Sequence, residues 1–374
     1  MEHKVLFTAS TYSHIRNFHL PYLRAFQERG WTVHVACGGK EEELPFTDRV
    51  IRLPLEKKMS SPRNFRAAAL LRRQIEAERY ELVCAHTTLA SFFTRLAVRL
   101  SRHKPKVINM VHGYLFDDES SAARRELLLT AERLCAPQTD LILTMNRYDT
   151  ELARRCRLAK RVEEVPGLGV DFSRFADPAL PGAELRRTLG IAEDAFVLIY
   201  PAEFSKRKNQ QLLIRALARL PRRAFLVLPG DGALLGACRG LAQELGVAGR
   251  VLFPGHIRGL GAWYDMADAA VSSSRSEGLP FNVMEAMHAA LPVAATAVKG
   301  HVDLIEPERD GLLFPYGDEA ACAEAIQRLM DTPELCARLG AAAAEDAEQY
   351  ALERVFPLVM GQYLSLVEEP ALVE

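Results

Sequence analysis

Short apolar runs alternate with stretches of helical periodicity along the first half of the chain. Residues 17–29, which end at Gly30, have the spacing of a helix, and the apolar runs around them have the length of strands. The predicted strands are residues 4–9, 31–37, 82–85, 107–111 and 141–144. Strands that alternate with helices are typical of a doubly wound parallel sheet, so we expect an α/β domain here.

The same alternation begins again after residues 165–169 (VPGLG), where proline and glycine interrupt regular structure. The predicted strands of this half are residues 196–201, 224–228, 251–253, 269–272 and 293–295. The predicted helices are about 209–220, 234–246, 280–290 and 318–330. We therefore expect two α/β domains, residues 1–168 and 169–349. A ligand is expected at the carboxyl ends of the strands, in the cleft between the domains.

Composition narrows the class of protein. With 49% hydrophobic and 25% charged residues and 23 glycines in 374, the chain has an ordinary globular mixture. No apolar run approaches the ~20 residues of a membrane span, and the run at residues 5–7 is too short for a secretory signal. The seven cysteines are scattered without a C-x-x-C pair, so neither a disulfide framework nor a zinc site is expected. A reducing cytoplasm is the expected location.

The near-zero net charge conceals an asymmetry between the halves. Residues 1–175 carry 29 Lys and Arg against 21 Asp and Glu, whereas residues 176–374 carry 18 against 27. The basic half is either a solvated Arg-rich surface or a face that attracts an anionic membrane. Residues 63–80 have the pattern of a basic amphipathic helix, which could lie on a membrane surface or pack on its own sheet. No aromatic platform accompanies the basic residues, so nucleic acid is not an expected partner.

Two glutamates in the second half form the most informative motif. Glu277 lies on the loop after a predicted strand, and Glu285 lies about one turn inside the following helix. Gly278 permits an unusual backbone angle or a close approach, and Pro280 suits the first turn of a helix. The amides of residues 281–283 are then expected to form a free helix N-terminus, which favours binding of a diphosphate.

The spacing of these carboxylates excludes one reaction. Two residues eight positions apart rise about 12 Å along a helix, so they would not converge on one bond like the acid pair of a glycosidase. They suit two separate contacts along an extended ligand. The alternative is structural, with Glu277 capping the helix and Glu285 as an ordinary helical residue.

This stretch resembles the E-x7-E signature of retaining GT-B glycosyltransferases of family GT4. Five further segments carry the same resemblance over nearly the whole chain. They are EFSKRKNQ at 203–210, VLFPGHIR at 251–258, GLLFPYGD at 311–318, VHGY at 111–114, and GVD at 169–171 with Phe175. The resemblance implies two Rossmann-like domains that face each other across a cleft, with a tail, about 350–374, returning to the first domain. The pattern E-x-x-K-x-K-N at 203–209 is similar to that of a GT4 subset that builds bacterial capsular polysaccharide or exopolysaccharide.

By this resemblance the second domain binds a nucleotide-sugar. Glu285 would accept hydrogen bonds from the ribose hydroxyls, Glu277 would hold sugar hydroxyls, and Lys208 would meet the leaving diphosphate. Most relatives have an arginine where this chain has Glu203, and Arg207 is the candidate that replaces it. The implied donor-binding residues are Arg207, Lys208, Asn209, His256, Ile257, Glu277, Gly278, Leu279, Pro280, Phe281, Asn282, Val283 and Glu285.

Histidines of the first half are candidates for the other substrate. His112 ends a predicted strand, and by the resemblance it lies beside the donor sugar and completes a catalytic set with Lys208 and Glu277; a buried structural histidine is the alternative. His14, Asn17 and His86 are candidates for the acceptor side. Capping of a helix by Ser13 would explain part of the first loop instead.

The resemblance implies a retaining reaction by front-face substitution without a protein nucleophile. No cofactor or metal is expected, since the chain lacks a D-x-D triplet and a helix dipole with Lys208 can replace a cation. The predicted function is transfer of a sugar from a UDP-sugar to a saccharide or lipid-linked saccharide, in the cytoplasm or at the inner face of the plasma membrane. An inactive transferase-like subunit, suggested by Glu203, and a sugar-nucleotide epimerase using Asp117 and Asp118 are the alternatives.

Overall fold

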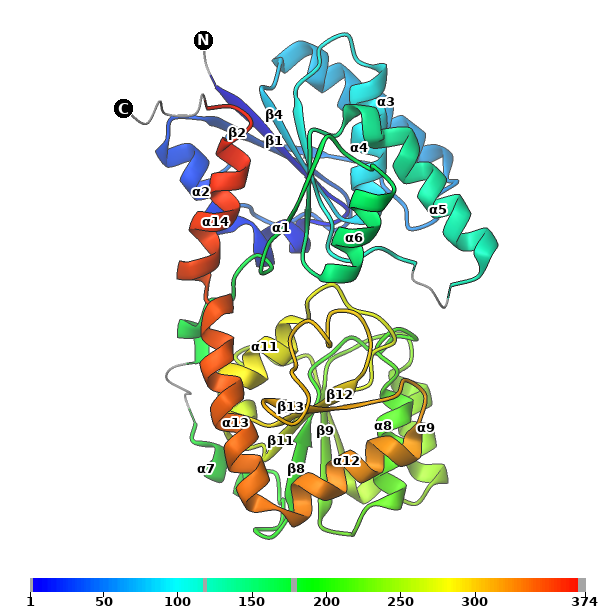
Figure 1. Cartoon of the computed structure of the whole chain (residues 1–374), viewed down its shortest axis with the longest axis vertical. Helices are drawn as coiled ribbons and strands as arrows, with labels where there is room; N and C mark the ends of the chain where they lie inside the picture. The colour runs from blue at the N-terminus through cyan, green and yellow to red at the C-terminus, as the bar shows by residue number, and fades with distance from the viewer. Residues whose placement is uncertain (1–2, 117–119, 176–179, 369–374) are drawn as a thin grey trace. The chain divides into compact units, whose positions relative to one another are not determined.

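The computed structural model describes residues 3–116, 120–175 and 180–368, which form two compact units. The first unit comprises Met1–Leu168 and Arg354–Glu374, and the second comprises Gly169–Glu353. The chain passes from the first unit to the second within the proline- and glycine-containing stretch, between Leu168 and Gly169. Each unit is built on one parallel sheet (Figure 1).

The described part of the first unit contains a seven-stranded parallel sheet in the order β3-β2-β1-β4-β5-β6-β7. Its strands are β1 (Lys4–Ala9), β2 (Thr32–Cys37), β3 (Arg49–Arg52), β4 (Leu82–His86), β5 (Lys106–Met110), β6 (Leu141–Thr144) and β7 (Arg161–Glu164). The hydrophobic pattern predicts neither β3 nor β7. Both are edge strands with mostly exposed or half-buried residues, so they carry no continuous apolar run.

Helices cover both faces of this sheet (Figure 1). They are α1 (Tyr12–Phe18), α2 (Leu20–Glu28), α3 (Pro62–Glu78), α4 (Thr88–Leu100), α5 (Ala122–Cys135) and α6 (Arg147–Arg155), with a 3-10 turn at Ala136–Gln138. The prediction of a single helix that starts at residue 17 is therefore wrong. The chain forms two helices that meet at His19, just before Pro21. Thr11, not Ser13, caps α1, accepting a hydrogen bond from the amide of His14.

The basic amphipathic segment forms α3, and its apolar face is used inside the domain. Ala68, Leu71 and Ile75 belong to a buried core cluster, while the arginines of the helix are exposed. The apolar side of this helix therefore packs within its own domain, which was one of the two alternatives for this segment. Its exposed arginines remain available to an external partner.

The second unit repeats the plan with a six-stranded parallel sheet over its described residues, in the order β10-β9-β8-β11-β12-β13. The strands are β8 (Phe196–Ile199), β9 (Ala224–Pro229), β10 (Val251–Gly255), β11 (Ala269–Ser272), β12 (Val293–Thr296) and β13 (Gly311–Phe314). The helices are α7 (Gly182–Thr188), α8 (Gln210–Arg219), α9 (Leu235–Glu244), α10 (Gly261–Asp265), α11 (Phe281–His288), α12 (Glu319–Asp331) and α13 (Pro333–Ala347). Short 3-10 turns lie at Phe172–Phe175, Ala248–Arg250 and Glu348–Tyr350.

The strand order fixes where each unit can bind a ligand. In both sheets the connections run outward in opposite directions from a switch point, between β1 and β4 in the first unit and between β8 and β11 in the second. Loops that leave the carboxyl ends of two such strands diverge and form a crevice. The loops concerned begin at Ser10 and Thr87 in the first unit, and at Tyr200 and Ser273 in the second.

The last helix, α14 (Leu352–Leu364), red in Figure 1, continues from the second unit and packs on the first. Tyr363 is fully buried there beside Phe7 and Phe26, and Arg161 donates hydrogen bonds to Gln362 and Ser365. Residues 369–374 of the predicted returning tail lie outside the described residues. Among the described helices, none combines the length and apolarity that a membrane crossing requires.

Candidate functional site

The carboxylate of Glu277 is the centre of a buried charged cluster at the switch point of the second sheet. Arg207 donates from Nη1 to Oε2 at 2.6 Å, and Lys208 donates from Nζ to Oε1 at 2.6 Å. Ser274 also donates to Oε1, at 2.5 Å. Burial alone would raise the pKa of Glu277, but the charges of Lys208 and Arg207 outweigh it and lower the pKa to about 2. Glu277 is therefore ionised at neutral pH.

The two cations lie on a loop that the rest of the domain holds firmly. Asn209 has a left-handed backbone with φ of 51°, which turns the chain into α8. The hydroxyl of Ser273 donates to the carbonyls of Lys208 and Asn209 at 3.0 and 2.9 Å. Tyr200, fully buried, shares a 2.7 Å hydrogen bond with the hydroxyl of Ser274. The loop after β8 and the loop after β11 are thereby joined on the side of the sheet where Glu277 lies.

Gly300 allows the backbone to pass directly behind Glu277. Its φ is +83°, and a Cβ atom added there would lie 2.8 Å from the Cβ of Glu277. Beside it, His301 is fully buried between the hydroxyls of Ser272 and Thr296, at 3.0 and 3.1 Å. Burial lowers the pKa of His301 to about 4, so this imidazole is neutral. The backbone at Gly300 therefore packs closely against the side chain of Glu277.

Glu285 occupies a different electrostatic environment from Glu277. Its Oε2 accepts a 2.8 Å hydrogen bond from Tyr264, whose hydroxyl also donates to the carbonyl of Asn282 at 3.3 Å. Burial raises the pKa of Glu285 to about 7, although the hydrogen bond from Tyr264 and the charge of Arg174 act in the opposite direction. The two carboxylates of the motif therefore differ in protonation near neutral pH, one fully ionised and one close to its midpoint.

The N-terminus of α11 lies between the two glutamates in the sequence. Pro280 is the N-cap residue, just outside the helix, and not within its first turn as predicted. The amides of Val283 and Met284 donate to the carbonyl of Pro280 at 3.2 and 3.3 Å. The prediction of a free amide is therefore wrong for Val283. Leu279 and Gly278 are buried, while Phe281 and Asn282 are half-buried. His256 and Ile257 follow β10 on a separate loop at the same edge of the sheet, with His256 exposed.

Four histidines gather at the corresponding edge of the first sheet. His14 lies on α1, His86 ends β4, and His112 follows β5. His19, which sequence reasoning did not select, completes the group, and one ring nitrogen from each lies within 4.8 Å of the others. Asn17 is exposed and is not part of this group. Asp117 and Asp118, the candidates for the epimerase alternative, lie outside the described residues.

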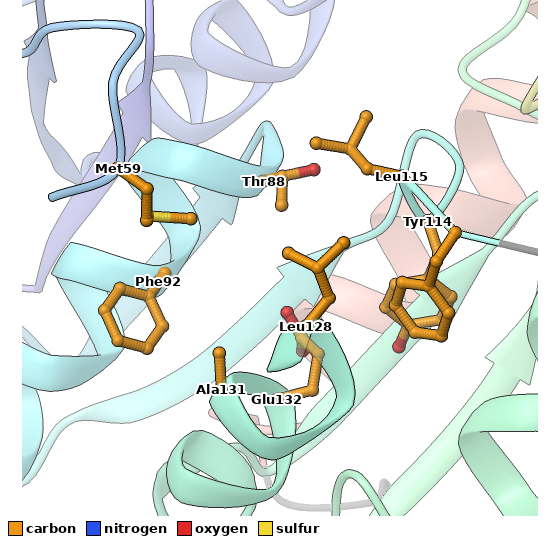
Figure 2. Close-up of a pocket in the computed structure, with 9 residues that line it drawn as sticks. Met59, Thr88, Phe92, Tyr114, Leu115, Leu128, Ala131 and Glu132 are labelled. Atoms are coloured by element: carbon orange, nitrogen blue, oxygen red, sulfur yellow. The ribbon is translucent and has the colours of Figure 1, made fainter. Parts of the chain in front are cut away.

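A mostly apolar pocket of the first unit is lined from α4 and α5. Figure 2 shows Met59, Phe92, Leu115 and Leu128 on its walls, with Glu132 among them. Glu132 forms a bidentate ion pair with Arg95, whose side chain is fully buried, at 2.9 Å for both bonds. The pair fixes α5 against α4, and the pocket opens between them.

Comparison with known proteins identifies the chain. The model of the family "Glycosyl transferases group 1" matches residues 182–346, and that of the "Glycosyl transferase 4-like domain" matches residues 19–167. EpsD of Bacillus subtilis (strain 168), a provisionally assigned glycosyltransferase, is 35% identical over 361 residues, which cover 95% of this chain and 94% of EpsD. This chain belongs to the group 1 glycosyl transferases, the GT4 family.

One further sequence relative and one solved structure are similar to this transferase. The "UDP-Gal:alpha-D-GlcNAc-diphosphoundecaprenol alpha-1,3-galactosyltransferase" of Escherichia coli is 24% identical over 308 residues, covering 78% of this chain and 79% of that protein. The crystal structure of Anabaena Alr3699/HepE in complex with UDP and glucose has a TM-score of 0.79 at 19% identity, covering 97% of this chain and all of that one. The expected GT-B fold is confirmed.

Sequence reasoning missed four residues that surround the glutamates in the second unit of this transferase. Ser274, Tyr264, Gly300 and His301 surround the two glutamates from positions outside the recognised segments or at unremarkable positions within them. Only Ser274 had a local sign, since it belongs to the serine run that precedes Glu277. The others approach because the strands β11 and β12 are neighbours and α10 packs near α11.

Proposed function

We propose that this glycosyltransferase moves a sugar from a UDP-sugar, with retention of anomeric configuration, to a saccharide or lipid-linked saccharide of a bacterial surface polysaccharide. The observation that carries the proposal is the cluster of Glu277, Lys208 and Arg207 at the switch point of the second sheet. It places two cations and an ionised carboxylate where an open α/β sheet binds nucleotides.

In this proposal the two cations receive the diphosphate. The side chain of Arg207 is about half exposed to solvent, whereas that of Lys208 is largely buried. When the bond between the anomeric carbon and the phosphate oxygen breaks, negative charge grows on the departing diphosphate. Fixed cations at that point stabilise the transition state more than the ground state. Arg207 then supplies the second positive charge that Glu203 cannot.

Glu277 would orient the sugar. A carboxylate offers about four acceptor positions, of which Arg207, Lys208 and Ser274 occupy three. The remaining position on Oε2 can accept from a sugar hydroxyl. Glu285 would accept hydrogen bonds from the ribose hydroxyls. The hydrogen bond from Tyr264 to Oε2 would hold its carboxylate in one orientation. His112 would donate to or accept from the donor sugar, as the family resemblance implies.

The reaction we propose is a front-face substitution. The acceptor hydroxyl oxygen bonds to the anomeric carbon on the face from which the diphosphate departs, and its proton passes to the departing phosphate oxygen. Both bonds change on one side of the sugar, so the configuration is retained. No metal is needed at this site in the proposal, since Lys208, Arg207 and the N-terminal end of α11 provide positive charge.

The identity of the substrates rests on two supports. The Escherichia coli relative is named for UDP-galactose as donor and a diphosphoundecaprenol-linked sugar as acceptor, and HepE was crystallised with UDP. In this chain, the apolar pocket of Met59, Phe92 and Leu128 could hold part of a lipid carrier, and the exposed arginines of α3 suit an anionic membrane face. Both features belong to the first unit, which would serve the acceptor.

A thermal-shift screen against UDP, GDP, ADP and their common sugars, with EDTA present, tests the proposal. We expect stabilisation by UDP compounds, because binding to the folded state alone raises the melting temperature. The shift should disappear in Glu285→Ala and persist in Glu334→Ala, an exposed glutamate on α13. NMR of the product formed from the selected α-linked donor then tests retention. A folded protein with no selective shift, or a β-linked product, would overturn the proposal.

A further inference from the structure

The histidine cluster of the first unit is unusual in the way its rings face one another. The cluster consists of His14, His19, His86 and His112. His14 Nε2 lies 3.3 Å from His112 Nε2, with the two rings at 90°. The ring centroids of the group are separated by 3.9 Å for His19 and His86 and by up to 6.3 Å for His14 and His86.

Two of these imidazoles are completely buried without a partner. His19 and His86 have no exposed surface, and among the described residues neither ring nitrogen of either side chain has a hydrogen-bond partner. An imidazole always carries at least one polar N–H or lone pair on each nitrogen, so a buried ring with neither nitrogen satisfied is destabilising. Such a pair inside a cluster of four imidazoles indicates that another group belongs among them.

The distances within the cluster approach those of a four-imidazole metal site. Zn–N bonds of 2.0–2.1 Å in a tetrahedron separate the ligating nitrogens by about 3.3 Å and the ring centroids by about 5 Å. The Nε2 atoms of His14 and His112 already have this separation, and the six centroid distances are spread around the second value. All four ligating nitrogens lie within 4.8 Å of one another, so the group would have to contract to reach the tetrahedral separation at every pair.

We propose that His14, His19, His86 and His112 bind one divalent first-row transition-metal cation, with Zn²⁺ as the tetrahedral case. Imidazole nitrogen is a preferred ligand of Zn²⁺, Ni²⁺ and Cu²⁺, whereas Mg²⁺ and Ca²⁺ require oxygen. All four ligands belong to the first unit, and the inference does not rest on the proposed function, which also gives His112 a contact with the donor sugar. It also differs from the expectation that no metal site exists in this chain.

The cation would join four segments at the carboxyl edge of the sheet. These segments are α1, the junction before α2, the end of β4 and the loop after β5. Four protein ligands form a closed coordination shell, which is typical of structural sites. His112 would bind through Nε2 and keep its Nδ1–H for a sugar hydroxyl, so both of its proposed roles are chemically compatible.

Cobalt titration of the tag-free, chelator-treated full chain tests the proposal. Tetrahedral Co²⁺ with nitrogen ligands absorbs strongly in the visible range, whereas aqueous octahedral Co²⁺ absorbs weakly. We expect one Co²⁺ per chain with the intense bands, their displacement by one Zn²⁺, and four nitrogen neighbours by X-ray absorption. Only weak bands, or a coordination shell dominated by oxygen, would overturn the proposal, and this measurement requires no variant.

Two variants sharpen the test. His14→Gln with His112→Gln replaces the half-buried members of the cluster and should abolish the intense bands and the rise in melting temperature produced by Zn²⁺. His3→Gln, which changes an exposed histidine of the same unit, should retain both. Equal Co²⁺ binding by the double variant and the wild type would locate the cation elsewhere and overturn the proposal.

Discussion

Lys208 Nζ lies 2.6 Å from Oε1 of Glu277, although the two residues are 69 positions apart in the sequence. Their side chains are only 12% and 7% exposed, so the contact is a buried ion pair, joined by Arg207 from the surface side. A buried charge that loses its partner is costly, because water cannot replace the partner. The same contact therefore links the stability of the second unit to its donor site.

Glu277→Gln should lower both stability and activity. The substitution preserves the shape of the side chain but leaves Lys208 without its buried counter-charge, so we expect a loss of about 3 kcal/mol in the free energy of unfolding. Transfer should fall by about 100-fold or more, since the charges at the diphosphate are no longer held in place. Urea unfolding and a UDP-release assay measure the two effects.

Glu308→Gln is the matched control for Glu277→Gln. Glu308 pairs with both terminal nitrogens of Arg328, at 2.8 and 3.0 Å, but about half of each side chain is exposed to solvent. Exposed pairs contribute less than about 1 kcal/mol, so this variant should remain close to the wild type. Equal losses in the two variants would show that the Glu277 cluster has no special role in stability.

The affinity for UDP should increase as the pH rises through neutrality. Burial raises the pKa of Glu285 to about 7, so the carboxylate becomes an acceptor with both oxygens only above that pH. The raised pKa also means that its ionisation opposes folding, and this effect grows as the pH rises from the unfolded value of about 4.5 to about 7. Calorimetric titration of UDP between about pH 6 and pH 8 measures the effect on binding.

Glu285→Gln separates this titration from that of the ligand. The phosphate groups of UDP titrate in the same range, and their contribution is common to both proteins. The variant should bind more weakly and lack the additional increase seen in the wild type. Parallel pH profiles for the two proteins would contradict a role for Glu285 ionisation in nucleotide binding.

Gly300→Ala should destabilise the second unit, because the added methyl group would crowd Glu277 in the donor site. The added methyl group would lie 2.8 Å from the Cβ of Glu277 and 2.9 Å from the carbonyl oxygen of Gly278, in a backbone with φ of +83°. Gly317 has the same φ but no neighbour within 4 Å of such a Cβ, so Gly317→Ala reports the backbone strain alone. We expect a cost of about 1 kcal/mol for Gly317→Ala and about 3 kcal/mol for Gly300→Ala. Thermal unfolding and UDP release compare them, and equal costs would refute crowding at Glu277.

Neutralising the exposed arginines of α3 should weaken binding to anionic vesicles. Each arginine near an anionic surface contributes about 1 kcal/mol, so replacing all four by glutamine should lower the partition coefficient by at least 100-fold at low salt. Vesicle sedimentation with and without anionic lipid measures this change. The residues to replace are Arg63, Arg66, Arg72 and Arg73.

The control for this experiment changes the same number of charges in the second unit. The proposed membrane contact belongs to the first unit and does not include the exposed arginines of the second. The residues to replace are Arg187, Arg219, Arg222 and Arg239. Equal losses in both variants would indicate a general charge effect, and unchanged binding in the α3 variant would remove the membrane contact from the proposal.

Local pattern was sufficient for much of the fold. Buried parallel strands are mostly apolar, so β1, β4, β8 and β11 stand out as short apolar runs between helical periods. The edge strands β3 and β7 do not stand out, because solvent on their outer sides permits arginine and glutamate. For these two edge strands, pairing with the neighbouring strand decides the structure, and their own composition does not reveal it.

The sequence by itself determined the two α/β halves, the break between them and the segments that carry Lys208, Glu277 and Glu285, because these depend on periodicity and short motifs. Only the tertiary structure decided that Glu277 is held by both Arg207 and Lys208, that Tyr264 fixes Glu285, and that His19 joins His14, His86 and His112. The physical reason is that side chains on separate strands and loops meet only when the sheet order is formed. Burial and nearby charge, which set the two glutamates' opposite pKa shifts, exist only after that assembly.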